Sequence, residues 1–142
     1  KLELLKLRVL DLKEGYRQNM AFLGDRYTGK TMIVQKFLAE LDDPQIVPVY
    51  IDLENSDLSH FFYKLVGSLL YHYSRSHGLA LADDLTLLMN TTEGYLPETI
   101  KAVKKIKGHL AQNREREAYL EIISLPQTFT QEADVYCVLF FD

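Results

Sequence analysis

The sequence has little of what marks a secreted, membrane-spanning or polyanion-binding protein. Its single cysteine, Cys137, excludes an internal disulfide framework and fits a reducing compartment. The formal net charge of −4 excludes a broadly positive face for a generic polyanion. No apolar run approaches the ~20 residues that a membrane helix needs, and no charged-then-apolar leader opens the chain. We therefore expect a soluble cytoplasmic domain with no membrane partner.

What is present is the composition of an ordinary globular domain. The chain has 142 residues, of which 47% are hydrophobic and 25% charged, so wholesale disorder is not expected. A chain of this length can bury roughly two thirds of its unfolded surface. This is enough for one domain with a real core.

Apolar spacing predicts helices that alternate with strands. The expected helices cover residues 2–15, 30–41, 57–77, 97–110 and 114–125, the last broken by Pro126, and either Ser56 or Asp57 can cap the third. The expected strands cover residues 19–23, 46–52 and 135–141, and residues 79–94 form a loop or a short helix. This alternation predicts an α/β fold, with a parallel sheet covered by helices on both faces in three layers.

The most specific motif lies between the first expected strand and the helix that follows it. Residues 24–31 read Gly24-Asp25-Arg26-Tyr27-Thr28-Gly29-Lys30-Thr31 and match the phosphate-loop pattern G-x-x-x-x-G-K-[ST]. The glycines let successive backbone amides surround one anion, and the start of the helix adds unpaired N–H groups. Lys30 reaches the terminal phosphates, and the Thr31 hydroxyl can bind Mg²⁺. The motif therefore predicts nucleotide binding by all eight residues.

A second part of the same site is expected at the other end of the sequence. Asp142 follows four apolar residues, 138–141, in the pattern of a strand that delivers one carboxylate to bound Mg²⁺. The carboxyl end of a buried parallel strand lies on the edge where such folds bind ligands. We therefore expect Thr31 and Asp142 to be the metal ligands.

Together these features resemble the nucleotide-binding domain of AAA-like P-loop ATPases, especially the archaeal-type ATPases of the STAND group. The resemblance rests on the helix that closes at Glu14-Gly15, the loop opening Gly24-Asp25-Arg26, the segment Tyr119 to Pro126, and the terminal Val138 to Asp142. It implies ATP with Mg²⁺ as ligands and a sheet order of 5-1-4-3-2. In that order residues 47–51 pair in parallel with residues 135–141, and residues 19–23 keep an open edge.

The resemblance also implies that residues 1–142 are one nucleotide-binding domain truncated at the Walker B strand. The sequence begins at Lys1 rather than at methionine. In the family an acidic residue that positions water follows the Walker B aspartate, and a sensor strand, an arginine finger and a helical lid come later. We therefore expect the fragment to bind ATP but to hydrolyse it poorly, without assigned catalytic residues, and to be unstable or to aggregate alone.

The residues leave three functions open. The leading one is an ATPase switch domain that associates with itself or with a protein partner through the rest of the chain. The alternatives are a nucleotide-dependent DNA-binding protein of the origin-recognition type, which needs a basic module beyond Asp142, and a small-molecule kinase. A solvated helix face is the preferred interpretation of the lysine cluster at residues 101–107, and the four histidines lack metal-ligand spacing.

Overall fold

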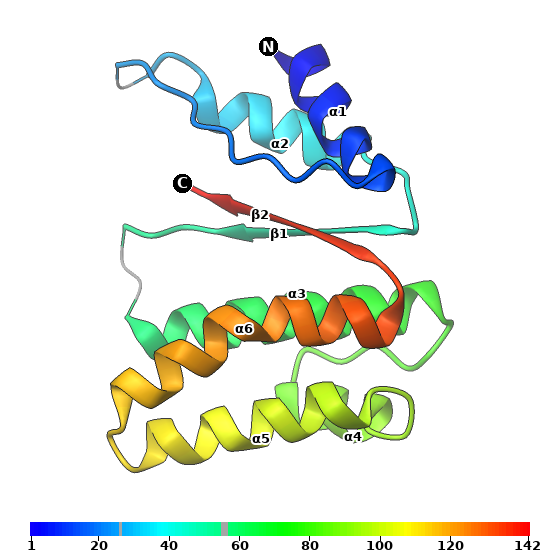
Figure 1. Cartoon of the computed structure of the whole chain (residues 1–142), viewed down its shortest axis with the longest axis vertical. Helices are drawn as coiled ribbons and strands as arrows, with labels where there is room; N and C mark the ends of the chain where they lie inside the picture. The colour runs from blue at the N-terminus through cyan, green and yellow to red at the C-terminus, as the bar shows by residue number, and fades with distance from the viewer. Residues whose placement is uncertain (26, 55–56) are drawn as a thin grey trace. The chain divides into compact units, whose positions relative to one another are not determined.

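A computed structural model describes residues 1–25, 27–54 and 57–142 (Figure 1). The chain divides into two compact units. The first contains Lys1–Asp43 together with Asp142, and the second contains Pro44–Phe141.

The first unit is a pair of helices joined by an extended segment. Helix α1 (Leu2–Leu10) continues into the 3₁₀ helix η1 (Asp11–Glu14), which ends at Gly15 in the left-handed conformation that glycine adopts without strain. Helix α2 (Lys30–Glu40) packs against α1. Leu5 and Val9 are the buried residues of α1, and a 2.7 Å ion pair joins Lys6 to Glu40. The predicted helices at both positions are confirmed.

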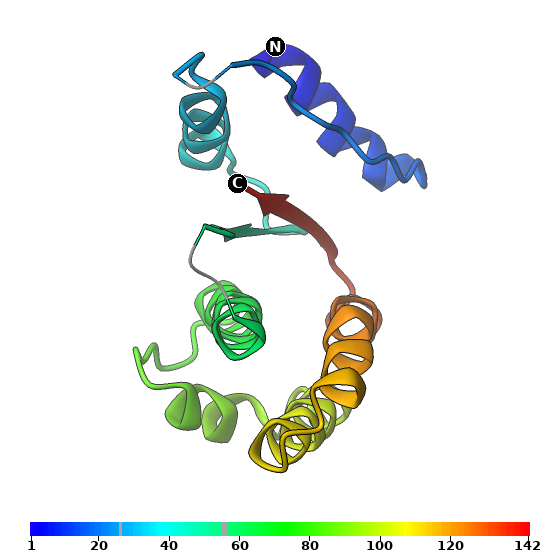
Figure 2. The ribbon, with the colours of Figure 1, turned by 90° about the vertical axis from the view of Figure 1, so that its left-hand side faces the viewer.

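The second unit places four helices on one side of a two-stranded sheet (Figures 1 and 2). Helices α3 and α6 form the layer next to the sheet, and α4 and α5 lie beyond them. In chain order the elements are β1 (Ile46–Ile51), α3 (Leu58–Ser76), α4 (Leu85–Thr92), α5 (Pro97–Ala111), α6 (Glu115–Ala133) and β2 (Tyr136–Phe141). None of the described helices combines the length and apolar character needed to span a membrane.

Strands β1 and β2 pair in parallel, as the sequence predicted. Their register sets Val47 opposite Cys137 and Ile51 opposite Phe141. Pro48 stands opposite Val138. Because proline cannot donate a ladder hydrogen bond, its position suits a strand that has one neighbour.

The predicted three-layer α/β sheet, with its order of 5-1-4-3-2, is wrong. Across the described residues the sheet has only two strands, and six α-helices account for most of the chain. The expected strand at residues 19–23 does not form, and the side chain of Leu23 is 89% exposed. An apolar run becomes a strand only when another strand accepts its backbone hydrogen bonds. The apolar pattern of residues 19–23 says nothing about whether such a neighbour exists.

The predicted break at Pro126 is also wrong, because α6 continues through it to Ala133. Proline removes the N–H that would bond the carbonyl of Ile122, four residues earlier. The helix persists because one of its faces is fully buried on both sides of the proline. Ile122 and Leu125 are the buried residues before the proline, and Phe129 is the buried residue after it. Burial of three large apolar side chains outweighs the lost backbone hydrogen bond.

The caps of two other helices follow local rules. Asp57 accepts a hydrogen bond from the backbone N–H of His60 at the start of α3, whereas the alternative cap, Ser56, lies outside the described residues. Asp84 accepts in the same way from Leu87 and begins α4 within the segment expected to be a loop or a short helix.

Cys137 in β2 is expected to be nearly inert toward thiol reagents in the folded protein. Burial raises the pKa of its thiol to about 12 from an ordinary value of 9.0. At pH 8 this lowers the reactive thiolate fraction about a thousandfold. Ellman's reagent should therefore react very slowly with the native chain and at the usual rate in denaturant. A fast native reaction would show that β2 is not packed as described.

Candidate functional site

The phosphate-loop motif forms a turn that leads directly into α2. Gly29 has a φ of 81° and is the N-cap residue of α2, so Lys30 and Thr31 begin the helix. A Cβ atom on Gly24 would lie only 3.0 Å from the Thr28 hydroxyl oxygen, so the close approach of the Thr28 side chain favours glycine there. Arg26, one of the eight predicted site residues, lies outside the described residues.

The ammonium group of Lys30 lies against the loop that precedes it. Its Nζ donates to the carbonyl oxygens of Gly24 at 2.6 Å and Asp25 at 2.7 Å. It also lies 3.4 Å from Oγ1 of Thr28, which donates to the Asp25 carbonyl at 2.8 Å. These contacts hold a positive charge at the centre of the loop. The ammonium has three N–H donors, and the one that faces the Thr28 hydroxyl has only a weak acceptor. An anionic oxygen is a stronger acceptor and can replace that hydroxyl.

Thr31 and Asp142 meet although they lie 111 positions apart in the sequence. The Thr31 hydroxyl donates to Oδ2 of Asp142 at 2.6 Å, and Asp142 groups with the first unit. The two residues predicted as metal ligands are thus neighbours. No group of three His, Cys, Asp or Glu side chains with metal-binding geometry occurs in the described part of the chain. One hydroxyl and one carboxylate still fit Mg²⁺, which completes its shell with phosphate oxygens and water.

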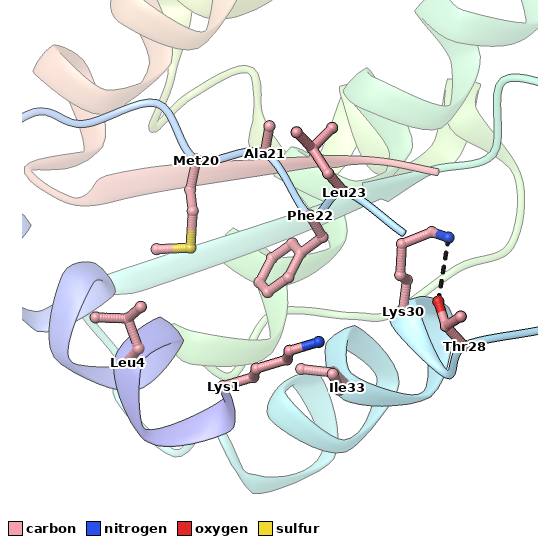
Figure 3. Close-up of a pocket in the computed structure, with 9 residues that line it drawn as sticks. All are labelled: Lys1, Leu4, Met20, Ala21, Phe22, Leu23, Thr28, Lys30 and Ile33. Atoms are coloured by element: carbon pink, nitrogen blue, oxygen red, sulfur yellow. Dashed lines mark hydrogen bonds between the residues drawn. The ribbon is translucent and has the colours of Figure 1, made fainter. Parts of the chain in front are cut away.

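A shallow cavity adjoins the loop within the first unit (Figure 3). Its volume is about 230 Å³, and its walls are mostly apolar. Thr28 and Lys30 line it on the side of the loop, and their side chains carry the hydrogen bond drawn in Figure 3. The other lining residues are Lys1, Leu4, Met20, Ala21, Phe22, Leu23 and Ile33.

The lysine cluster of α5 is partly neutralised. Lys104 pairs with Glu93, and Lys105 pairs with Glu121, each at 2.5 Å. This pairing fits the preferred interpretation of a solvated helix face, because it neutralises two of the four lysines in the cluster.

Sequence reasoning missed the surroundings of the motif. It treated Leu23 as part of a buried strand and gave Met32 no role, yet both side chains are exposed. A signal was available, because residues that directly flank a surface loop share its exposure. The Thr28 hydroxyl donates to the carbonyl of Asp25, three residues earlier. This spacing is typical of a local turn and is visible in the sequence.

Comparisons of the chain with models of known protein families, with curated proteins and with solved structures gave no match.

Proposed function

We propose that this chain binds Mg-ATP through Gly24–Thr31 and Asp142 and acts as an ATP-dependent switch domain. ATP hydrolysis is part of the proposal. The resemblance to AAA-like P-loop ATPases of the STAND group suggests the switch role and the preference for adenine.

The hydrogen bond between Thr31 and Asp142 is the observation that carries the proposal. A chance match to the loop motif gives no reason for a distant aspartate to lie 2.6 Å from its last residue. In phosphoryl-transfer sites the loop hydroxyl and a strand-end aspartate hold the same Mg²⁺ ion. The pair predicted from two separate motifs is the pair that the fold brings into contact.

Each part of the proposed site makes a different contact with the bound nucleotide. The first-turn amides of α2 face the phosphates and add the positive end of the helix dipole. Lys30, held by the carbonyls of Gly24 and Asp25, supplies a fixed positive charge. Mg²⁺, held by Thr31 and Asp142, would neutralise phosphate charge. Tight binding of the triphosphate is the chemistry that this arrangement supports.

The two alternative functions receive less support. A DNA-binding role needs a positive surface, whereas the chain has a net charge of −4 and two of its clustered lysines are paired with glutamates. A small-molecule kinase needs an acceptor site with basic residues. The two arginines at the start of α6, Arg114 and Arg116, alternate with Glu115 and Glu117 instead.

Removing either metal ligand is expected to abolish the Mg²⁺ dependence of ATP binding. Thr31→Ala deletes the hydroxyl, and Asp142→Asn deletes the negative charge while keeping the shape. Calorimetric titration with ATP, in Mg²⁺ and in EDTA, should show tighter binding in Mg²⁺ for the native chain, by about tenfold. For each variant the two affinities should become nearly equal.

Asp83→Asn is the matched control, because Asp83 is an exposed aspartate in the second unit. It should retain the full Mg²⁺ effect. Variants of Thr31 and Asp142 that keep the native Mg²⁺ dependence would refute the metal assignment.

A further inference from the structure

Helix α1 is apolar on two faces. One face packs in the first unit through the buried residues Leu5 and Val9. Leu4, Leu7 and Leu10 lie outside that face and are 51%, 56% and 51% exposed. Residues three positions apart are neighbours on a helix, so these three leucines form one row, which we call the leucine row. A surface helix normally has polar side chains on the face away from its core, so the leucine row indicates an interaction surface.

Acidic residues stand at both ends of the leucine row. Glu3 is four positions before Leu7, and its side chain is 87% exposed. Glu14 is four positions after Leu10. Four positions correspond to about one helical turn, so each carboxylate lies close to a leucine of the row.

A cavity of about 260 Å³ adjoins the leucine row within the first unit. Leu10 is one of four apolar residues in its walls. The charged wall residues are one lysine and three acidic residues, namely Lys6, Glu40, Asp42 and Asp43. Lys6 is already paired with Glu40 at 2.7 Å, so the excess charge of the walls is negative. A lysine or arginine side chain has an apolar stem and a cationic head, and this combination matches apolar walls with acidic residues among them.

We propose that the leucine row and the adjoining cavity form a docking surface for a protein partner, which contributes an amphipathic helix with leucine-like residues flanked by lysine or arginine. The inference is separate from the proposed nucleotide site. Amphipathic helices bind in this way by laying an apolar face on an exposed apolar surface, and here charge complementarity selects a basic helix. A second copy of the chain is a poorer occupant, because its own leucine row has the same acidic residues and like charges would meet.

A model helical peptide of about 18 residues, with leucines on one face and lysines on the other, tests this surface. Fluorescence anisotropy of the labelled peptide measures its affinity for the full chain. The native chain should bind the peptide, and the affinity should fall as NaCl rises from about 0.05 to about 0.5 M. The same peptide with glutamate in place of every lysine should bind at least tenfold more weakly, an order-of-magnitude expectation from charge complementarity.

Leu7→Gln removes the central leucine of the row and should weaken binding of the basic peptide by about tenfold. Circular dichroism should show a normal fold, because the side chain is 56% exposed. Leu87→Gln is the matched control, since Leu87 is 56% exposed on α4 in the second unit. It should bind the peptide like the native chain. Asp42→Asn should weaken binding less than Leu7→Gln and reduce its dependence on salt.

The proposal would be overturned if the native chain did not bind the basic peptide, or if Leu7→Gln and Leu87→Gln bound it equally well. Equal binding of the acidic peptide would overturn the charge complementarity. Sedimentation velocity tests the other occupant. A dimer of the native chain that Leu7→Gln dissociates would assign the leucine row to a second copy and also overturn the proposal.

Discussion

Replacement of Lys30 with alanine is expected to lower the affinity for ATP by roughly 10- to 150-fold. The Lys30 ammonium lies at the centre of the loop, where two backbone carbonyls fix it at 2.6 and 2.7 Å. A charge-assisted contact of this kind contributes about 1.5–3 kcal/mol to binding. Because the ammonium is already positioned before the ligand arrives, little conformational entropy is lost when the phosphate binds.

Isothermal titration of ATP into the native chain and Lys30→Ala measures the effect directly. Lys36→Ala is the matched control, since it removes an exposed lysine from the same helix. Its affinity for ATP should equal that of the native chain. Equal affinities of Lys30→Ala and the native chain would show that the loop does not bind phosphate.

The features that the sequence predicted are those governed by short-range rules. The phosphate loop is contiguous, and its glycines and the start of α2 follow from residue type and spacing alone. The parallel pairing of β1 with β2 was also predicted, although it is long-range, because a family resemblance supplied the neighbour. The proximity of Thr31 and Asp142 was predicted from two motifs that were expected to hold the same metal.

The features that the sequence failed to predict depend on partners that periodicity does not reveal. Residues 19–23 have the apolar pattern of a strand, but no strand lies beside them in the described structure. At Pro126 the local rule for breaking a helix was outweighed by burial of Ile122 and Phe129 on the same face. Because the helix was predicted to end at Leu125, Glu132 was not expected to lie on it. Glu132 reaches its hydrogen-bond partners because α6 continues to Ala133.

Glu132 joins the end of α6 to the start of α5. Its carboxylate accepts hydrogen bonds from the backbone N–H groups of Glu98 and Thr99, each at 2.8 Å, and from the Thr99 hydroxyl at 2.6 Å. The first amides of a helix lack partners within the helix and carry partial positive charge. The glutamate thus caps α5 from another helix, at a residue 33 positions away from Thr99.

Glu132→Ala is therefore expected to lower the free energy of unfolding of the second unit by about 2–3 kcal/mol. The estimate follows from the loss of hydrogen bonds to a charged acceptor, which leaves Thr99, a buried residue, without its partner. Urea unfolding followed by circular dichroism gives this free energy.

The free energy of unfolding of Glu132→Gln should lie between those of the native chain and Glu132→Ala, because its amide oxygen accepts hydrogen bonds without carrying the charge. Gln131→Ala, at the exposed neighbouring position, should change stability by less than about 0.5 kcal/mol. If Glu132→Ala were as stable as Gln131→Ala, the cap would contribute nothing, and the docking of α5 on α6 would depend on apolar contacts alone.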